Sequence, residues 1–261
     1  MINKKIYSVD GEIYYWISEN RHDKSIMFTH GLTADHTLFD KQIEFWSKEY
    51  TVIVWDMPLH GLSKKYKNFS YTNAARDIKM ILDEENIKHA VMAGQSAGGY
   101  IVQEFIRRYG EMCDAFISID STPLGLSYYR KMELFFICNL AKIIRLYPYN
   151  YYCKVSVTGV ARSEESKKSF MNTLKKSDKK SIIKAVNLVY RDFKNYSEVD
   201  IKCPVLLVMG EFDEYGKVRE YNKMWKAKTG YQSIVISNAS HNSNYDNYEE
   251  FNEKVYEFLS D

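Results

Sequence analysis

Residues 90–105 read AVMAGQSAGGYIVQEF and carry the strongest structural signal in the sequence. The apolar run Ala90 to Ala93 predicts a buried strand, and the residues after Gly99 are apolar at helical spacing. Between them lies a G-x-S-x-G pattern centred on Ser96, whose glycines leave room for a sharp turn from strand to helix. Such a pattern also arises by chance in glycine-rich turns. The flanking strand and helix favour Ser96 as a nucleophile whose Oγ projects above the sheet edge.

Short apolar runs elsewhere in the chain predict the rest of a sheet. Each run is bounded by polar or turn residues and is apolar on both faces, which suits a parallel sheet covered by helices. The runs are 26–29, 51–55, 90–93, 115–119, 205–209 and 234–236. Two further runs rich in β-formers, 6–9 and 13–16, flank Asp10-Gly11 and predict an N-terminal hairpin.

Apolar residues at helical spacing occupy several of the intervals between these runs. The segments that show this spacing are 38–46, 74–82, 100–105 and 251–258. Alternating strands and helices predict a doubly wound α/β fold with a mostly parallel sheet.

This alternation stops between about Ser121 and Lys202. We therefore expect a core made of residues 1–120 and 203–261, with a helical insertion at 121–202. The insertion holds 16 Lys and Arg against 7 Asp and Glu, a net charge of +9. Because the whole chain carries only +2, the core must carry −7.

The near-neutral total charge gives no whole-chain reason to expect a nucleic acid or a membrane as partner. A small-molecule substrate is the expected partner, and the oligomeric state is left open. The N-terminus lacks the apolar region and cleavage site of a signal peptide. The most apolar stretch, 134–144, is far shorter than the ~20 residues that cross a bilayer. We therefore expect a cytoplasmic protein.

Neither a metal nor a cofactor is expected. The four cysteines have no closely spaced C-x-x-C pair, and the chain contains no H-E-x-x-H pattern. The glycines at 94–99 do not form the phosphate-binding pattern that ends in Lys-Ser or Lys-Thr.

A serine nucleophile needs a base that accepts its proton and an acid that orients the base. His241 follows the run 234–236, and Asp213 follows the run 205–209, so both lie where loops leave the carboxyl ends of parallel strands. Asp120 ends the neighbouring run 115–119 and is the alternative acid. The predicted order along the chain is Ser96, Asp213 and His241.

An oxyanion also needs backbone N–H donors beside the nucleophile. His30-Gly31-Leu32 follows the run 26–29 and must turn sharply there. We expect the N–H groups of Leu32 and Ala97 to form the donor pair, and His30 to be a turn residue that bonds to nearby backbone.

These motifs together resemble the α/β-hydrolase fold family. The residues that carry the resemblance are His30-Gly31, Asp56-Met57-Pro58-Leu59-His60-Gly61-Leu62-Ser63, Gly94-Gln95-Ser96-Ala97-Gly98, Asp213 and Ser240-His241-Asn242. The resemblance implies that the segment 56–63 supports the nucleophile turn and that 121–202 is a variable helical cap. Dehalogenases and epoxide hydrolases of this family place an aspartate where this chain has Ser96, which argues against both activities.

The resemblance implies a serine hydrolase that cleaves a small or medium carboxylic ester or lactone through an acyl-enzyme. One alternative is a carbon–carbon bond hydrolase or lyase that acts on an anionic substrate. The basic insertion is the only local feature that supports this alternative. Another alternative is a ligand receptor with low turnover on the same fold.

The insertion offers two features whose roles the sequence leaves open. Aromatic residues crowd positions 128–152, where they either line a pocket or pack the insertion onto the core. Lysines crowd positions 167–184, where they either form a solvated helical face or attract an anion.

Overall fold

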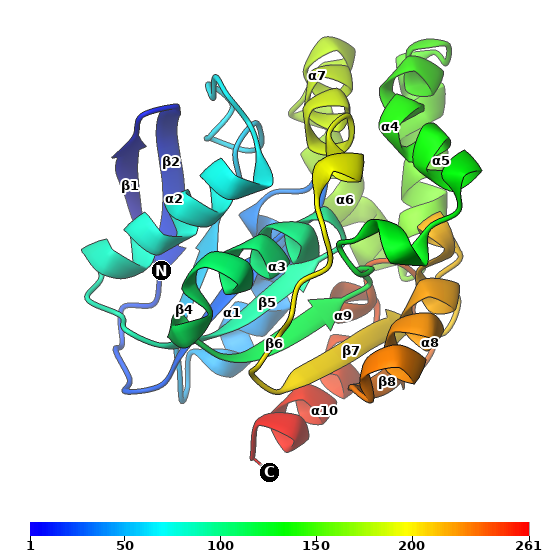
Figure 1. Ribbon diagram of the computed structural model, residues 1–261. Coiled ribbons are helices and arrows are strands. Elements are labelled where there is room, and N and C mark those ends of the chain that lie inside the picture. The colour runs from blue at the N-terminus through cyan, green and yellow to red at the C-terminus, as the bar shows by residue number, and fades with distance from the viewer. Residues whose placement is uncertain (261) are drawn as a thin grey trace.

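The computed structural model describes residues 1–260 and contains one mixed sheet with helices on both faces (Figure 1). The strands are β1 Ile2–Ser8, β2 Gly11–Ile17, β3 Ser25–Thr29, β4 Thr51–Trp55, β5 Ala90–Gln95, β6 Cys113–Ile119, β7 Val205–Gly210 and β8 Gln232–Ile236. Their spatial order is β1-β2-β4-β3-β5-β6-β7-β8. β1 and β2 form the expected antiparallel hairpin, β2 also pairs antiparallel with β4, and all other pairs are parallel. The predicted doubly wound, mostly parallel α/β fold is confirmed.

Residues 1–260 also form ten α-helices. They are α1 Asp40–Trp46, α2 Tyr71–Glu84, α3 Ala97–Tyr109, α4 Lys131–Arg145, α5 Tyr149–Val160, α6 Glu164–Lys175, α7 Lys179–Tyr190, α8 Val218–Thr229, α9 Ser243–Asp246 and α10 Tyr248–Ser260. The segment predicted as one helix over 38–46 divides into a 3₁₀ turn, His36–Phe39, and α1. The Asp35 side chain accepts a hydrogen bond from the Thr37 N–H and caps this 3₁₀ turn.

Two apolar layers hold the helices onto the sheet. One layer joins α2, α3 and α8 to the sheet through residues such as Ile78, Phe105 and Trp225. The other joins α1 and α10 to the opposite face through Trp46 and Phe251. The strands buried between these layers are apolar on both faces, as a doubly covered parallel sheet requires.

Helices α4 to α7 all lie in the segment 121–202, between β6 and β7 (Figure 1). They stand together at one end of the sheet, and α7, α4 and α5 project farthest from it in this view. We call the segment 121–202 the insertion. Within residues 1–260 no helix combines the length and the apolar character that a membrane span needs.

Candidate active site

Ser96 occupies the turn between β5 and α3 in a backbone conformation that residues other than glycine rarely adopt. Its φ is 51° and its ψ is −120°. Glycines permit the turn: a Cβ on Gly94 would lie 2.7 Å from Gly99 Cα, and a Cβ on Gly98 would lie 2.3 Å from the Thr29 carbonyl oxygen. Strain of this kind is typical of functional positions, where the surrounding structure holds it in place.

The structure brings Ser96, His241 and Asp213 into one hydrogen-bonded line. The His241 Nε2 atom lies 2.9 Å from Ser96 Oγ, and its Nδ1 atom lies 2.9 Å from Asp213 Oδ2. Asp213 follows β7 and His241 follows β8, so the three residues meet at the carboxyl edge of the sheet. The Asp213 carboxylate can only accept a hydrogen bond, so the neutral imidazole of His241 carries its proton on Nδ1. Its Nε2 lone pair then faces the serine hydroxyl.

Asp120, the alternative acid, lies nearby but has other hydrogen-bond partners. Its Oδ1 accepts the N–H of Gly210 and its Oδ2 accepts the N–H of Ser243, each at 2.9 Å. The side chain is fully buried, and this burial together with the charge of Asp213 raises the pKa of Asp120 well above its ordinary value. Asp120 therefore links Gly210, at the end of β7, to Ser243, two residues after His241.

Two opposing effects act on the imidazole of His241. Burial disfavours the charged ring, but the charge of Asp213 and its hydrogen bond outweigh the burial and raise the pKa of His241. The ring is further covered by Tyr215, whose centroid lies 4.7 Å away. On the other side of the loop, the Gln95 amide donates to the His241 carbonyl oxygen at 2.8 Å.

The turn that contains Leu32 packs directly against the nucleophile. A Cβ on Gly31 would collide with Gln95 Oε1 and would lie 3.0 Å from Ser96 Cβ, so a larger residue would crowd the nucleophile turn. Leu32 lines the same cavity as Ser96 and His241, and Ala97 is the first residue of α3. Their role as oxyanion donors stays a prediction.

Two buried histidines hold this turn in place. His30 accepts the Met57 N–H at Nε2 and donates to the Gly31 carbonyl oxygen from Nδ1, as expected of a turn residue. His60 accepts the Thr33 N–H at Nε2, 3.0 Å away. Burial lowers the pKa of His60 to about 3, so the ring stays a neutral acceptor at neutral pH. The segment 56–63 thus contacts the Leu32 turn.

The insertion covers Ser96 and leaves a cavity of about 30 Å³ beside it. The insertion residues that line it are Tyr152, Ser156, Val160, Phe170 and Tyr190, and the core adds Leu32, Thr33, Ala34, Gln95, Tyr215 and Asn242. Of the aromatic residues noted at 128–152, only Tyr152 lines this cavity. Tyr190 and Tyr215 were missed because they lie far from any recognisable motif and approach Ser96 only when the helices pack.

Hydrogen bonds fasten the insertion to the loop that carries His241. The N–H of Asn242 donates to the Val160 carbonyl oxygen, and Ser240 Oγ donates to the Gly159 carbonyl oxygen. The Asp246 carboxylate accepts the N–H groups of Arg162 and Ser163. The end of α5 is therefore fixed beside the imidazole. Within residues 1–260 no group of His, Cys, Asp or Glu side chains is arranged to hold a metal ion.

The family model described as "alpha/beta hydrolase fold" matches residues 24–136. A thermophilic esterase from Thermogutta terrifontis superimposes with a TM-score of 0.81 at 19% identity, over 100% of this chain and 98% of that chain. The chain therefore has the α/β-hydrolase fold.

Two curated relatives are similar in sequence. The uncharacterized hydrolase YugF of Bacillus subtilis is 34% identical over 98 residues, which span only 36% of this chain and 36% of YugF. A putative esterase/lipase of Haemophilus influenzae is 20% identical over 87% of this chain and 80% of its own length. These names describe the relatives themselves.

Proposed function

We propose that the protein is a serine hydrolase that cleaves a small or medium carboxylic ester or lactone through an acyl-enzyme on Ser96. The observation that carries this proposal is the hydrogen-bonded line from Ser96 through His241 to Asp213, with Ser96 on a strained turn. This arrangement can remove the hydroxyl proton as the oxygen attacks a carbonyl carbon.

The proposed reaction has two steps. In the first step His241 Nε2 takes the proton of Ser96, Oγ bonds to the substrate carbonyl carbon, and the N–H groups of Leu32 and Ala97 stabilise the oxyanion. His241 then gives its proton to the leaving alkoxide as the ester bond breaks. In the second step His241 deprotonates a water that attacks the acyl carbon, and it then returns this proton to Ser96 Oγ as the bond between Oγ and the acyl group breaks and the acid leaves. Asp213 stabilises the imidazolium in both steps.

The cavity supports a short, uncharged acyl group. A volume of about 30 Å³ is only a few times the ~10–15 Å³ needed to hold one water, so a long acyl chain requires the insertion to move. None of the described residues that line the cavity is Lys or Arg. The basic charge of the insertion therefore gives no direct support to an anionic group beside Ser96. A lactone is a cyclic ester, and the same attack opens it.

A panel of esters, thioesters and lactones of graded acyl length tests the proposal. We expect many turnovers on short esters, and a loss of about 10⁶-fold in kcat for Ser96→Ala. A fluorophosphonate probe should label Ser96, because Oγ displaces fluoride only when it is activated. The matched control is Ser260→Ala, which removes an exposed hydroxyl from α10. Turnover of Ser96→Ala near the unsubstituted level would refute the mechanism, and a single slow event per chain would favour a receptor.

A further inference from the structure

Helix α4 is apolar on its exposed side as well as on its buried side. Ala141 and Ile144 are buried against the rest of the protein. Met132, Phe135 and Phe136 recur at three- and four-residue spacing on the opposite side of the helix, and they are 66%, 61% and 53% exposed. Asn139 and Lys142 interrupt this outer face, and in the described part of the chain nothing covers the exposed Met132, Phe135 and Phe136.

The loop after α4 and the helix α5 extend this apolar surface. Leu146 in the loop is 81% exposed, and Tyr151 and Val155 lie exposed one turn apart on α5. The rings of Tyr147 and Tyr151 stack on each other at 5.7 Å, in the solvent rather than against the core. Exposed apolar side chains that gather on neighbouring helices are typical of an interaction surface.

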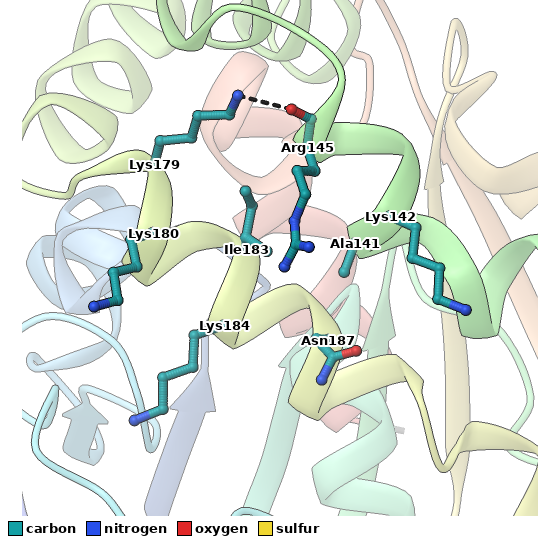
Figure 2. Close-up of a pocket in the computed structure, with 8 residues that line it drawn as sticks. All are labelled: Ala141, Lys142, Arg145, Lys179, Lys180, Ile183, Lys184 and Asn187. Atoms are coloured by element: carbon teal, nitrogen blue, oxygen red, sulfur yellow. Dashed lines mark hydrogen bonds between the residues drawn. The ribbon is translucent and has the colours of Figure 1, made fainter.

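Cations line a groove beside α4. A groove of about 640 Å³ runs between α4 and α7, and Figure 2 shows its lining. The Arg145 side chain points between the two helices, and Lys180 and Lys184 extend from α7 next to each other. Lys142 extends from α4 and belongs to the exposed face as well as to the groove. The floor of the groove is Ala141 and Ile183.

The groove carries more positive than negative charge. Asp178 caps α7 through the Ser181 N–H and interacts with the charge of Lys180, and Glu133 pairs with Lys217. In the described part of the chain, Lys142, Lys180 and Lys184 have no carboxylate oxygen within 4.0 Å. The surface thus combines protruding aromatic and aliphatic side chains with unpaired cations.

We propose that the outer face of α4 and α5, with the groove between α4 and α7, binds the surface of an anionic lipid bilayer. Aromatic and aliphatic side chains would enter the boundary between headgroups and acyl chains, and the lysines and Arg145 would meet the lipid phosphates. The near-neutral charge of the whole chain gave no reason to expect a membrane partner, but the insertion carries +9 against −7 on the core. This separation of charge orients the insertion toward an anionic surface.

A bilayer suits these observations better than a second copy of the chain. Two copies that met through this face would bring two insertions of +9 together, and like charges repel. The proposal is independent of hydrolysis, because the surface residues lie outside the cavity that holds Ser96. Vesicle binding of Ser96→Ala therefore tests it even if the proposed function fails.

Vesicle flotation tests the proposal with the full chain. We expect binding to vesicles of phosphatidylcholine mixed with phosphatidylglycerol, and little binding to phosphatidylcholine alone. Neutralising Lys142, Lys180 and Lys184 to Gln should weaken binding by roughly 100-fold, since each cation near an anionic surface contributes about fivefold. Phe135→Ser with Phe136→Ser should weaken binding at least about tenfold, because less apolar area enters the interface.

Control variants change exposed lysines and one exposed apolar residue on the core. Lys88, Lys223 and Lys226, all exposed, are replaced together by Gln, and exposed Val9 is replaced by Ser. These variants should bind vesicles as the unsubstituted protein does, and all variants should keep its melting temperature. The proposal is overturned if the unsubstituted protein stays unbound, or if the core variants lose as much binding. It is also overturned if the protein dimerises in solution through Phe135 and Phe136 and ignores vesicles.

Discussion

Replacing Asp213 by Asn and, separately, Asp120 by Asn distinguishes the two carboxylates buried beside His241. Asp213 accepts a hydrogen bond from His241 Nδ1, whereas Asp120 accepts two backbone N–H groups, from Gly210 and Ser243. Each substitution keeps the shape of the side chain and replaces one acceptor oxygen by a donor NH₂ group. The structure therefore predicts that Asp213→Asn lowers the rate with little loss of stability, and that Asp120→Asn lowers the stability with little loss of rate.

The Asp213→Asn change should act on the rate. An amide donor opposite Nδ1 favours the imidazole tautomer that has its proton on Nε2, and that tautomer cannot accept the proton of Ser96. In serine proteases the corresponding change lowers kcat by about 10⁴-fold. We expect a loss of that order in kcat, a KM within a few-fold of the unsubstituted value, and a small change in melting temperature.

The Asp120→Asn change should act on stability. The single oxygen of Asn accepts one of the two N–H groups, and the other N–H then faces a donor in a fully buried position. An unsatisfied buried donor costs about 1–3 kcal/mol. At roughly 2–4 °C per kcal/mol, the melting temperature should fall by several degrees. We expect kcat to fall by about tenfold at most, because His241 keeps its partner.

Initial rates on a soluble short-chain ester and a thermal melt of each variant measure both effects. The reasoning is refuted if Asp120→Asn loses about 10⁴-fold in kcat while Asp213→Asn stays within about tenfold. That result would make Asp120 the acid. Equal losses in both variants would show that the two carboxylates act as one unit.

Three further expectations concern the turn, the base and the groove. His60→Ala should lower kcat by up to about 10²-fold with little change in KM, because the turn of Leu32 loses its support, and His60→Gln should restore part of the rate. The rate should rise with pH through the pKa of His241, because only the neutral ring accepts a proton. We expect the midpoint of this rise above the ordinary pKa of ~6.5, and a midpoint below that value would contradict the structure. Replacing Lys180 and Lys184 by Gln should leave kcat/KM unchanged for neutral and anionic soluble esters alike, and a selective, salt-sensitive loss for anions would place the groove in substrate capture.

The sheet could be predicted from the sequence because its signals are local. A doubly covered strand must be apolar on both faces, so runs such as 51–55 and 205–209 stand out without knowledge of the rest of the chain. Helix α8 received no prediction, because its buried residues Val218, Tyr221 and Trp225 are few among charged neighbours. The pattern there becomes visible only once the sheet provides a face for it.

The candidate site likewise contains residues that local sequence signals predict and residues that only the packing brings together. Ser96, Asp213 and His241 could be named because each follows a recognisable strand, and parallel strands end at one edge. Sequence left Asp120 and Asp213 as alternatives, because both occupy strand ends and only side-chain direction separates them. The cavity wall formed by Tyr190 and Tyr215 depends on how α7 and the loop after β7 pack, and no spacing in the sequence encodes that.

The insertion shows why residue type alone could not assign its surface. Aromatic residues at 128–152 were expected either to line a pocket or to pack onto the core, and Tyr152 and Tyr129 do these two things. Phe135 and Phe136 do neither, because the buried side of α4 is already filled by residues such as Ile144. An aromatic side chain excluded from both places must face solvent or a partner. Binding to anionic vesicles distinguishes these two possibilities. If a membrane is the partner, Phe135 and Phe136 should become buried on anionic vesicles, even though the negatively charged core is repelled by them.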